Sequence, residues 1–279
     1  MTTKFVVNDY VLIWNLLFQA SISDTIYKLK QKIWDTYKEE YNAVFQDKSD
    51  IMKDYKNFIP NDDTIYNILL ENKDYEKLKN QVEKQRIEIM KVWDKNKKES
   101  DALYQDILRK KIPDHVVFVV NKELNMIDYQ MDHIIIFGKE YDKREPLQLL
   151  LDIHLKIFKH HVKKYKEPYE KFKKAILELA VLNEYATRIT GRSCYQSGSP
   201  YLLPLKRWLY PYWLMYLGVP KEEFSTYMMR DKIVFDENQY AYEKELKKMN
   251  MEEFIDFCIR NQRYIVREKK EEKVIEELV

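Results

Sequence analysis

The chain has 279 residues, of which 45% are hydrophobic and 14% aromatic, so it can bury the core of one large domain or of two modest ones. Its 48 basic residues nearly balance its 46 acidic residues, so no overall field draws it to nucleic acid or to a membrane, and any such binding must be local. Four glycines and eight prolines are too few for the tight turns of a many-stranded sandwich or barrel, and they predict long helices.

The cysteine content and the amino end bear on where the protein is located. Cys194 and Cys258 form neither a Cys-x-x-Cys pair nor a framework of disulfide bonds, which fits a reducing compartment, and we expect a cytoplasmic protein. The apolar run Tyr10–Phe18 resembles the core of a signal peptide, but Asp9 and Asn15 interrupt the pattern, which favours an amphipathic helix. No apolar run reaches the length needed to cross a membrane, so no membrane span is expected.

Residues 1–110 show a helical pattern over almost their whole length. Apolar residues recur at steps of three and four over Tyr27–Phe45, which predicts a long helix whose start Ser23 can cap. Proline and capping residues over 58–63 predict a break. A charge-rich helix is expected over Tyr75–Leu108. We therefore expect residues 1–110 to form a helical N-terminal region.

The pattern changes after Pro113. Two short runs rich in β-branched residues, 114–120 and 132–137, predict two strands, and these two strands are candidates for direct pairing. Pro146 suits the first turn of a helix, and another helix is expected between Pro168 and Gly191.

Two further helices are expected, an aromatic one over Leu205–Leu217 and a final one from Met251. The predicted fold class is therefore mainly α with a small β element (α+β). We expect two regions, the helical N-terminal region 1–110 and a core with C-terminal helices over 111–279, packed together as one unit.

Three of the five histidines, His154, His160 and His161, lie within eight positions of the helix predicted after Pro146. On a helical projection His154 shares a stripe with Leu147, Leu150 and Leu151, so its side chain is expected to point inward, whereas His160 points elsewhere. Two metal ligands on one helix face need a spacing of three or four residues, so these histidines alone do not form a zinc site. His154 is then either a buried residue hydrogen-bonded to a neighbour or a ligand that shares a metal with another element.

The order of elements over residues 111–220 suggests such a partner. Two strands, a helix with an inward histidine and a second helix containing Asn183-Glu184 resemble the core of the gluzincin metallopeptidases, the thermolysin-like zincins. In that family a strand edge borders the cleft, one helix carries His-Glu-x-x-His, and the next helix supplies a glutamate, often within Asn-Glu, as the third zinc ligand. The resemblance implies that His154 and Glu184 would be the metal ligands here.

The first family motif is degenerate in this chain. The five positions read Leu150-Leu151-Asp152-Ile153-His154, so leucine replaces both the first ligand and the general-base glutamate. Catalytic zinc needs three protein ligands and a carboxylate that accepts the proton of the zinc-bound water, so this mechanism should be absent. No cofactor is therefore expected, although zinc could still bind.

The resemblance predicts a catalytically inactive, metallopeptidase-like protein that binds a peptide or protein partner in a residual cleft beside the strand at 132–137. One alternative is an active metal-dependent hydrolase with an atypical site, in which His154, Glu184 and Asp152 are the candidate catalytic residues. For Glu184 an ion pair with Arg188, four residues later, is the structural alternative.

A lysine-rich segment over 156–174 offers a different kind of surface. Its candidate binding residues are Lys163, Lys164, Lys173 and Lys174, with aromatic residues interleaved, and they could hold a nucleic-acid backbone or an acidic partner. A solvated corner between two helices is the simpler interpretation, because the chain is nearly neutral and carries no nucleic-acid motif. A helical interaction or nucleic-acid-binding protein stays a third hypothesis, although nucleic acid is not the partner we expect.

Overall fold

The chain is mainly helical with a small β element in the computed structural model, which confirms the predicted fold class. The predicted break over 58–63 and most of the predicted helix over Tyr27–Phe45, with its cap at Ser23, lie outside the described residues. The structure describes residues 3–9, 11–12, 16, 20–21, 24, 27–28, 31, 72–120, 124–125, 130–131, 134–137, 146–194, 197–224 and 237–266.

The chain divides into two compact units. The first comprises Met1–Lys97 and Ile112–His160, and the second comprises Lys98–Lys111 and His161–Val279. The chain therefore passes between the units three times, and only the passage next to residue 111 coincides with the predicted boundary. Each unit combines segments from both predicted regions, and whether the two regions fold as one domain stays a prediction.

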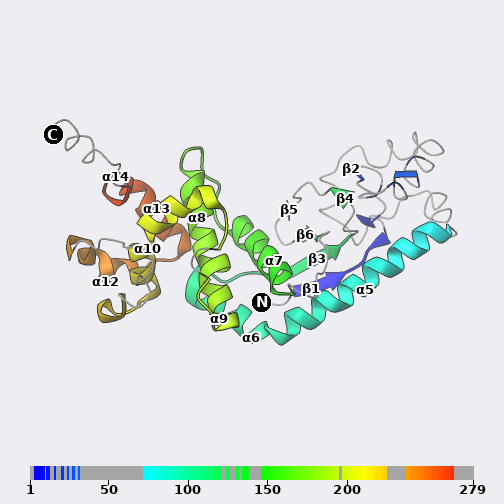
Figure 1. Ribbon diagram of the computed structural model, residues 1–279, viewed down its shortest axis with the longest axis horizontal. Helices are drawn as coiled ribbons and strands as arrows, with labels where there is room; N and C mark the ends of the chain where they lie inside the picture. Colours follow the sequence, from blue (N-terminus) through cyan, green and yellow to red (C-terminus); the bar gives the residue numbers. More distant parts are fainter. Residues whose placement is uncertain are drawn as a thin grey trace, which may run out of the picture. The chain divides into compact units, whose positions relative to one another are not determined.

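A four-stranded sheet forms the centre of the first unit (Figure 1). The strands β1, β3 and β6 are parallel, whereas β5 is antiparallel to β6. The two predicted strands are confirmed as β3 and β6, and they pair directly. The order across the sheet is β1 (Thr3–Val6), β3 (His115–Val119), β6 (Ile134–Phe137) and β5 (Gln130–Met131).

The strand β3 lies between two partners, and its apolar sequence reflects this position. Val117, Phe118 and Val119 are fully buried, as expected of a parallel strand with both faces covered. A short antiparallel pair also joins β2 (Ala20–Ser21) to β4 (Leu124–Asn125).

The helix α5 (Lys73–Lys95) packs along β1 and β3. Asn72 caps its start, because the side-chain oxygen accepts hydrogen bonds from the amides of Asp74 and Tyr75 at 2.9 and 3.2 Å. Its buried side chains recur at helical spacing, so one face of a highly charged helix meets the sheet. These side chains are Tyr75, Leu78, Val82, Ile89 and Trp93.

The helix predicted to begin at Pro146 is confirmed as α7 (Pro146–His161), which also belongs to the first unit apart from its last residue. Near the amino end, residues 9, 11, 12 and 16 are helical, and Val11, Leu12 and Leu16 are buried, in agreement with the amphipathic helix expected over Tyr10–Phe18.

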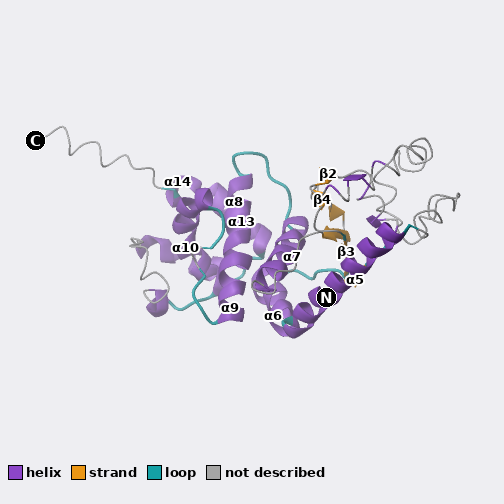
Figure 2. Ribbon diagram, turned by 45° about the vertical axis from the view of Figure 1, so that its right-hand side comes forward, coloured by secondary structure: helices purple, strands orange, loops and turns teal. Residues whose placement is uncertain are grey.

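Over its described residues the second unit consists of helices and loops. The helices α8, α10 and α13 pack against one another (Figure 2). None of the described helices of the chain is long and apolar enough to cross a membrane. The elements along this part of the chain are α6 (Lys97–Ala102), a π-helical segment (Leu103–Leu108), α8 (Glu170–Glu178), a second π-helical segment (Leu179–Tyr185), α9 (Ala186–Thr190), α10 (Leu203–Leu217), α12 (Glu243–Leu246), α13 (Met251–Arg260), α14 (Gln262–Ile265), and 3₁₀ turns at Pro200–Leu202, Lys221–Glu223 and Glu237–Tyr242.

Aromatic rings form the core between α10 and α13. Trp213 stacks on Tyr216 with ring centroids 5.4 Å apart, and Tyr216 stacks on Phe254 at 4.6 Å. This confirms the helices predicted over Leu205–Leu217 and from Met251, and it shows that their apolar faces meet.

Candidate functional site

His154 points inward from α7, as the helical projection predicts. The side chain is fully buried, and its ring stacks on Trp93 of α5 with centroids 4.8 Å apart. Burial lowers the pKa of His154 to about 3, so the imidazole is neutral near pH 7. The neighbouring Leu150 and Leu151 are buried as well, and they occupy the positions where the gluzincin motif has a histidine and a glutamate.

Asn183 and Glu184 lie in the π-helical segment of the second unit. The Oε1 atom of Glu184 accepts a hydrogen bond from Arg188 Nε at 2.8 Å, so the ion pair that the spacing suggests is present. The amide of buried Asn183 donates to the carbonyl of Ser197 at 3.1 Å and also to that of Cys194. Both residues of the Asn-Glu pair therefore have partners within the second unit.

His154 and Glu184 belong to different units, and a metal site shared by them stays a prediction. Within the described parts of the chain, no group of three or more His, Cys, Asp or Glu residues lies close enough to hold a metal ion. The third candidate, Asp152, accepts a hydrogen bond at 3.0 Å from Gln148 on the same helix.

A buried ion pair fixes the loop that follows α9. Lys206 Nζ lies 3.2 Å from Glu178 Oε2 and donates to the carbonyl of Ser197 at 2.6 Å. Both oxygens of Glu178 also accept from the Ser199 amide at 3.1 Å. Burial lowers the pKa of Lys206, while Glu178 opposes that shift. Gly198 has a φ of 110°, which residues with a side chain rarely adopt, and a Cβ atom there would lie 2.2 Å from Glu178 Oε2, so this position favours glycine.

The four candidate lysines have different surroundings. Lys173 departs from the expectation of a binding surface, because it is buried and donates to the carbonyls of Val162 and Lys163 at 2.9 and 3.0 Å. The side chain of Lys163 pairs with Asp256 at 2.6 Å. Lys174 lies 3.8 Å from Glu167, and Lys164 is exposed. The segment is a helix corner in which one lysine is used internally and two are paired.

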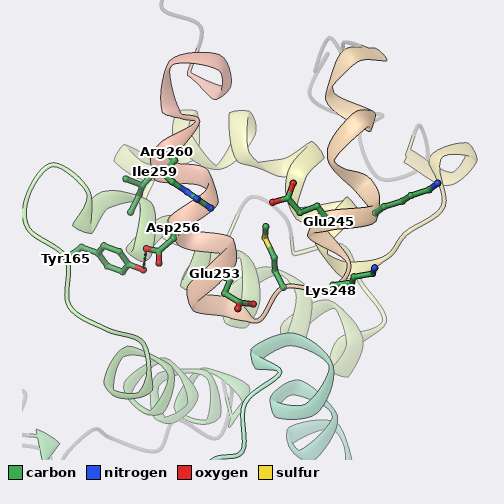
Figure 3. A pocket seen from close by; sticks show the side chains of 9 residues that line it. Tyr165, Glu245, Lys248, Glu253, Asp256, Ile259 and Arg260 are labelled. Carbon is green, nitrogen blue, oxygen red and sulfur yellow. Dashed lines mark hydrogen bonds between the residues drawn. The ribbon is translucent and has the colours of Figure 1, made fainter.

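The second unit also contains a groove of about 980 Å³, and its lining brings apolar, acidic and basic side chains together. Its walls come from α12 with the turn that follows it and from α13 (Figure 3). Figure 3 shows Glu253, Asp256 and Arg260 on the α13 side and Glu245 and Lys248 on the other. The lining residues are Tyr165, Lys244, Glu245, Lys248, Met249, Glu253, Asp256, Ile259 and Arg260.

The start of α13 is fixed by reciprocal hydrogen bonds. Asn250 Oδ1 accepts from the amides of Glu252 and Glu253 at 2.9 and 3.1 Å, and Glu253 Oε2 accepts from the Asn250 amide at 2.8 Å. This capping box satisfies backbone donors at the first turn of α13 and so fixes where the helix begins. The Asn-x-x-Glu spacing that forms it can be read from the sequence.

Asp256 connects the groove to the segment after α7. It accepts from the Tyr165 hydroxyl at 3.0 Å and pairs with Lys163 at 2.6 Å. The Tyr165 amide donates to Glu170 at 3.0 Å, which holds the backbone of this segment in place. Burial, together with the hydrogen bond to Asp256, raises the pKa of Tyr165, so its hydroxyl stays a neutral donor.

Arg109 holds the wall of the groove that the turn after α12 forms. Its Nη1 atom donates to the carbonyls of Lys247 and Met249 at 2.8 and 3.0 Å, and Nη2 donates to the carbonyl of Tyr216 at 2.6 Å. The guanidinium also lies 4.2 Å from the centre of the Tyr216 ring. One side chain thus joins the turn between α12 and α13 to the end of α10 and fixes the groove's geometry.

Comparison with known proteins gives no relative from which a function could be transferred: no family model, no curated protein and no solved structure matches this chain.

Proposed function

We propose that this chain is a peptide- or protein-binding protein and that the groove between α12 and α13 holds its partner. The observation that carries the proposal is the groove's lining, in which Tyr165, Met249 and Ile259 supply apolar surface and charged side chains surround them. Apolar surface bordered by polar groups is typical of protein recognition sites, and methionine adapts to different side chains. A volume of about 980 Å³ suits several side chains of a peptide.

The rigidity of the walls supports the same proposal. Arg109 and the capping box at Asn250 fix the two sides independently of any ligand. A preformed groove loses less conformational entropy when a partner binds than a groove that must first be ordered. A fixed lining is therefore suited to recognition.

The proposal includes no hydrolysis, since leucines stand where the gluzincin motif has its first ligand and its general base. The proposed binding site between α12 and α13 also differs from the cleft that the resemblance implies beside residues 132–137. In the sheet, β6 pairs with β3 on one side and with β5 at Ile134 and Ile135 on the other, so these two residues do not form a free edge. A gluzincin relationship and a cytoplasmic location stay predictions.

The direct test is a binding survey with Ile259→Asp, which places a charge in the apolar lining. The full chain is applied to an array of immobilised peptides of about twelve residues with varied composition, a length that suits groove recognition. We expect the wild-type chain to bind a subset of the peptides and Ile259→Asp to weaken that binding by about tenfold or more.

The matched control is Ile87→Asp, which makes the same change at an exposed position of α5 in the other unit. It should bind like the wild-type chain. Circular dichroism of both variants reports whether they stay folded. Absence of any bound peptide, or equal binding by a folded Ile259→Asp variant, contradicts the proposal.

A further inference from the structure

We propose that the groove selects acidic segments, so that its partner presents Asp or Glu side chains next to a bulky apolar side chain. This inference rests on the proposed function and adds the chemical class of the partner. It is carried by the charges that line the groove, because some of them already have partners and others do not.

The acidic side chains of the groove are largely compensated within the protein. Asp256 is paired with Lys163 and bonded to Tyr165. Glu253 accepts from the backbone at the amino end of α13, where the helix dipole favours a negative charge. Only Glu245 has a carboxylate with no hydrogen bond or ion pair among the described residues.

The basic side chains of the groove are in the opposite situation. Lys244, Lys248 and Arg260 are exposed, and none of them forms an ion pair or a side-chain hydrogen bond with any described residue. Among the described lining residues, three cations without such a partner therefore outnumber the one carboxylate without one, Glu245. The lining complements a ligand with negative groups, and such complementarity provides specificity.

Arg260 is placed to recognise a carboxylate of the partner. Figure 3 shows its side chain extending from α13 toward the side of the groove that carries Glu245. A guanidinium binds a carboxylate through two parallel hydrogen bonds, which neither lysine can do. Lys244 and Lys248 belong to the α12 side of the groove and supply further positive charge there. The apolar neighbour of the bound acid would then contact Met249 and Ile259.

A peptide fits this lining better than a nucleic acid does. Lys244, Lys248 and Arg260 are separate cations on two sides of the groove, and they do not form the continuous basic track along which a polyphosphate backbone binds. A peptide presents separate carboxylates that can reach the cations individually. For this reason we assign the site to an acidic peptide segment rather than to RNA or DNA.

The experiment compares three fluorescein-labelled peptides derived from a sequence that binds the chain, with Glu, Gln or Lys at the same positions and unchanged apolar residues. Fluorescence anisotropy with the full chain gives the three dissociation constants. We expect the Glu peptide to bind about tenfold more tightly than the Gln peptide, and the Lys peptide to bind most weakly. Added salt should reduce the advantage of the Glu peptide, because the cations involved are exposed.

The variant Arg260→Gln tests the residue assignment. It should remove most of the preference for Glu over Gln while leaving the affinity for the Gln peptide unchanged. Arg263→Gln, at an exposed position of α14 outside the groove lining, is the matched control and should retain the preference. A preference that survives Arg260→Gln contradicts the role of this side chain.

The outcomes separate the two proposals. Equal affinities for the Glu and Gln peptides, both weakened by Ile259→Asp, would overturn acid selection and leave the groove as the binding site. Peptide binding that Ile259→Asp does not weaken would overturn the proposed function itself. A single-stranded RNA of similar length that binds more tightly than the Glu peptide would also overturn the inference, in favour of phosphate recognition.

Discussion

The imidazole of His154 stacks on Trp93 inside the first unit, and burial holds its pKa near 3. Its inward direction could be predicted from its position among the leucines of α7, because helical spacing alone decides which face a residue occupies. Its contact with Trp93 could not be predicted, because Trp93 lies on another helix, about sixty residues earlier. The sequence likewise suggested the ion pair of Glu184 with Arg188, a local contact, but not the burial of Lys173.

Because burial lowers the pKa of His154, we expect the free energy of unfolding to depend on pH. An unfolded histidine takes up a proton below about pH 6.5, whereas folded His154 does so only near pH 3, so falling pH between these values favours the unfolded state. Replacing it by phenylalanine removes this effect and keeps an aromatic ring against Trp93. Between pH 7 and pH 5 the wild-type chain should lose about 2 kcal/mol more stability than His154→Phe, as measured by urea unfolding.

His160→Phe is the control for this comparison. His160 is half-buried at the end of α7, and its replacement should leave the wild-type pH dependence in place. Equal loss of stability by the wild-type chain and His154→Phe would show that His154 is not kept neutral by burial.

At the scale of the elements, the helices α5, α7, α8, α10 and α13 and the strands β3 and β6 could be predicted, because each is specified by a local pattern of apolar spacing, proline or capping residues. The short helix α12 was not predicted. The two π-helical segments were not predicted, because their apolar residues fit an ordinary helical pattern equally well. The groove was not predicted either. Its walls are held by Arg109, whose carbonyl partners at Lys247 and Met249 lie 138 and 140 residues along the chain.

Arg109 is the residue whose loss should most affect how α12 meets α13. Lysine keeps the positive charge but has a single nitrogen that cannot reach three carbonyls, so Arg109→Lys should reduce the free energy of unfolding by about 2 kcal/mol. Urea unfolding at neutral pH gives this value. Arg109→Lys should also weaken peptide binding, because Arg109 positions the turn at Lys247–Met249.

Arg188→Lys is the matched control, since Arg188 forms partly exposed ion pairs with Glu184 and Asp106. Such pairs contribute little, and the control should change the stability by less than about 1 kcal/mol. Similar stabilities of the two variants would mean that Arg109 does not fix the turn.

At the scale of the whole molecule, composition and apolar spacing were sufficient to predict the fold class, because few glycines and long helical patterns exclude sheet-rich folds. They were not sufficient to locate the candidate site. The groove combines Tyr165 with residues 244–260, and the sequence does not show that these segments meet. The resemblance to gluzincins predicts a site at His154 and Glu184, whereas neither of these residues lines the groove.

Hydrogen–deuterium exchange on the full chain, with and without a saturating Glu-containing peptide, tests the central claim most directly. Binding in the groove should slow amide exchange over residues 244–260 and around Tyr165, and it should leave α5 in the first unit unchanged. Slower exchange confined to other segments, or none over 244–260 despite measurable binding, would contradict the claim that this groove holds the partner.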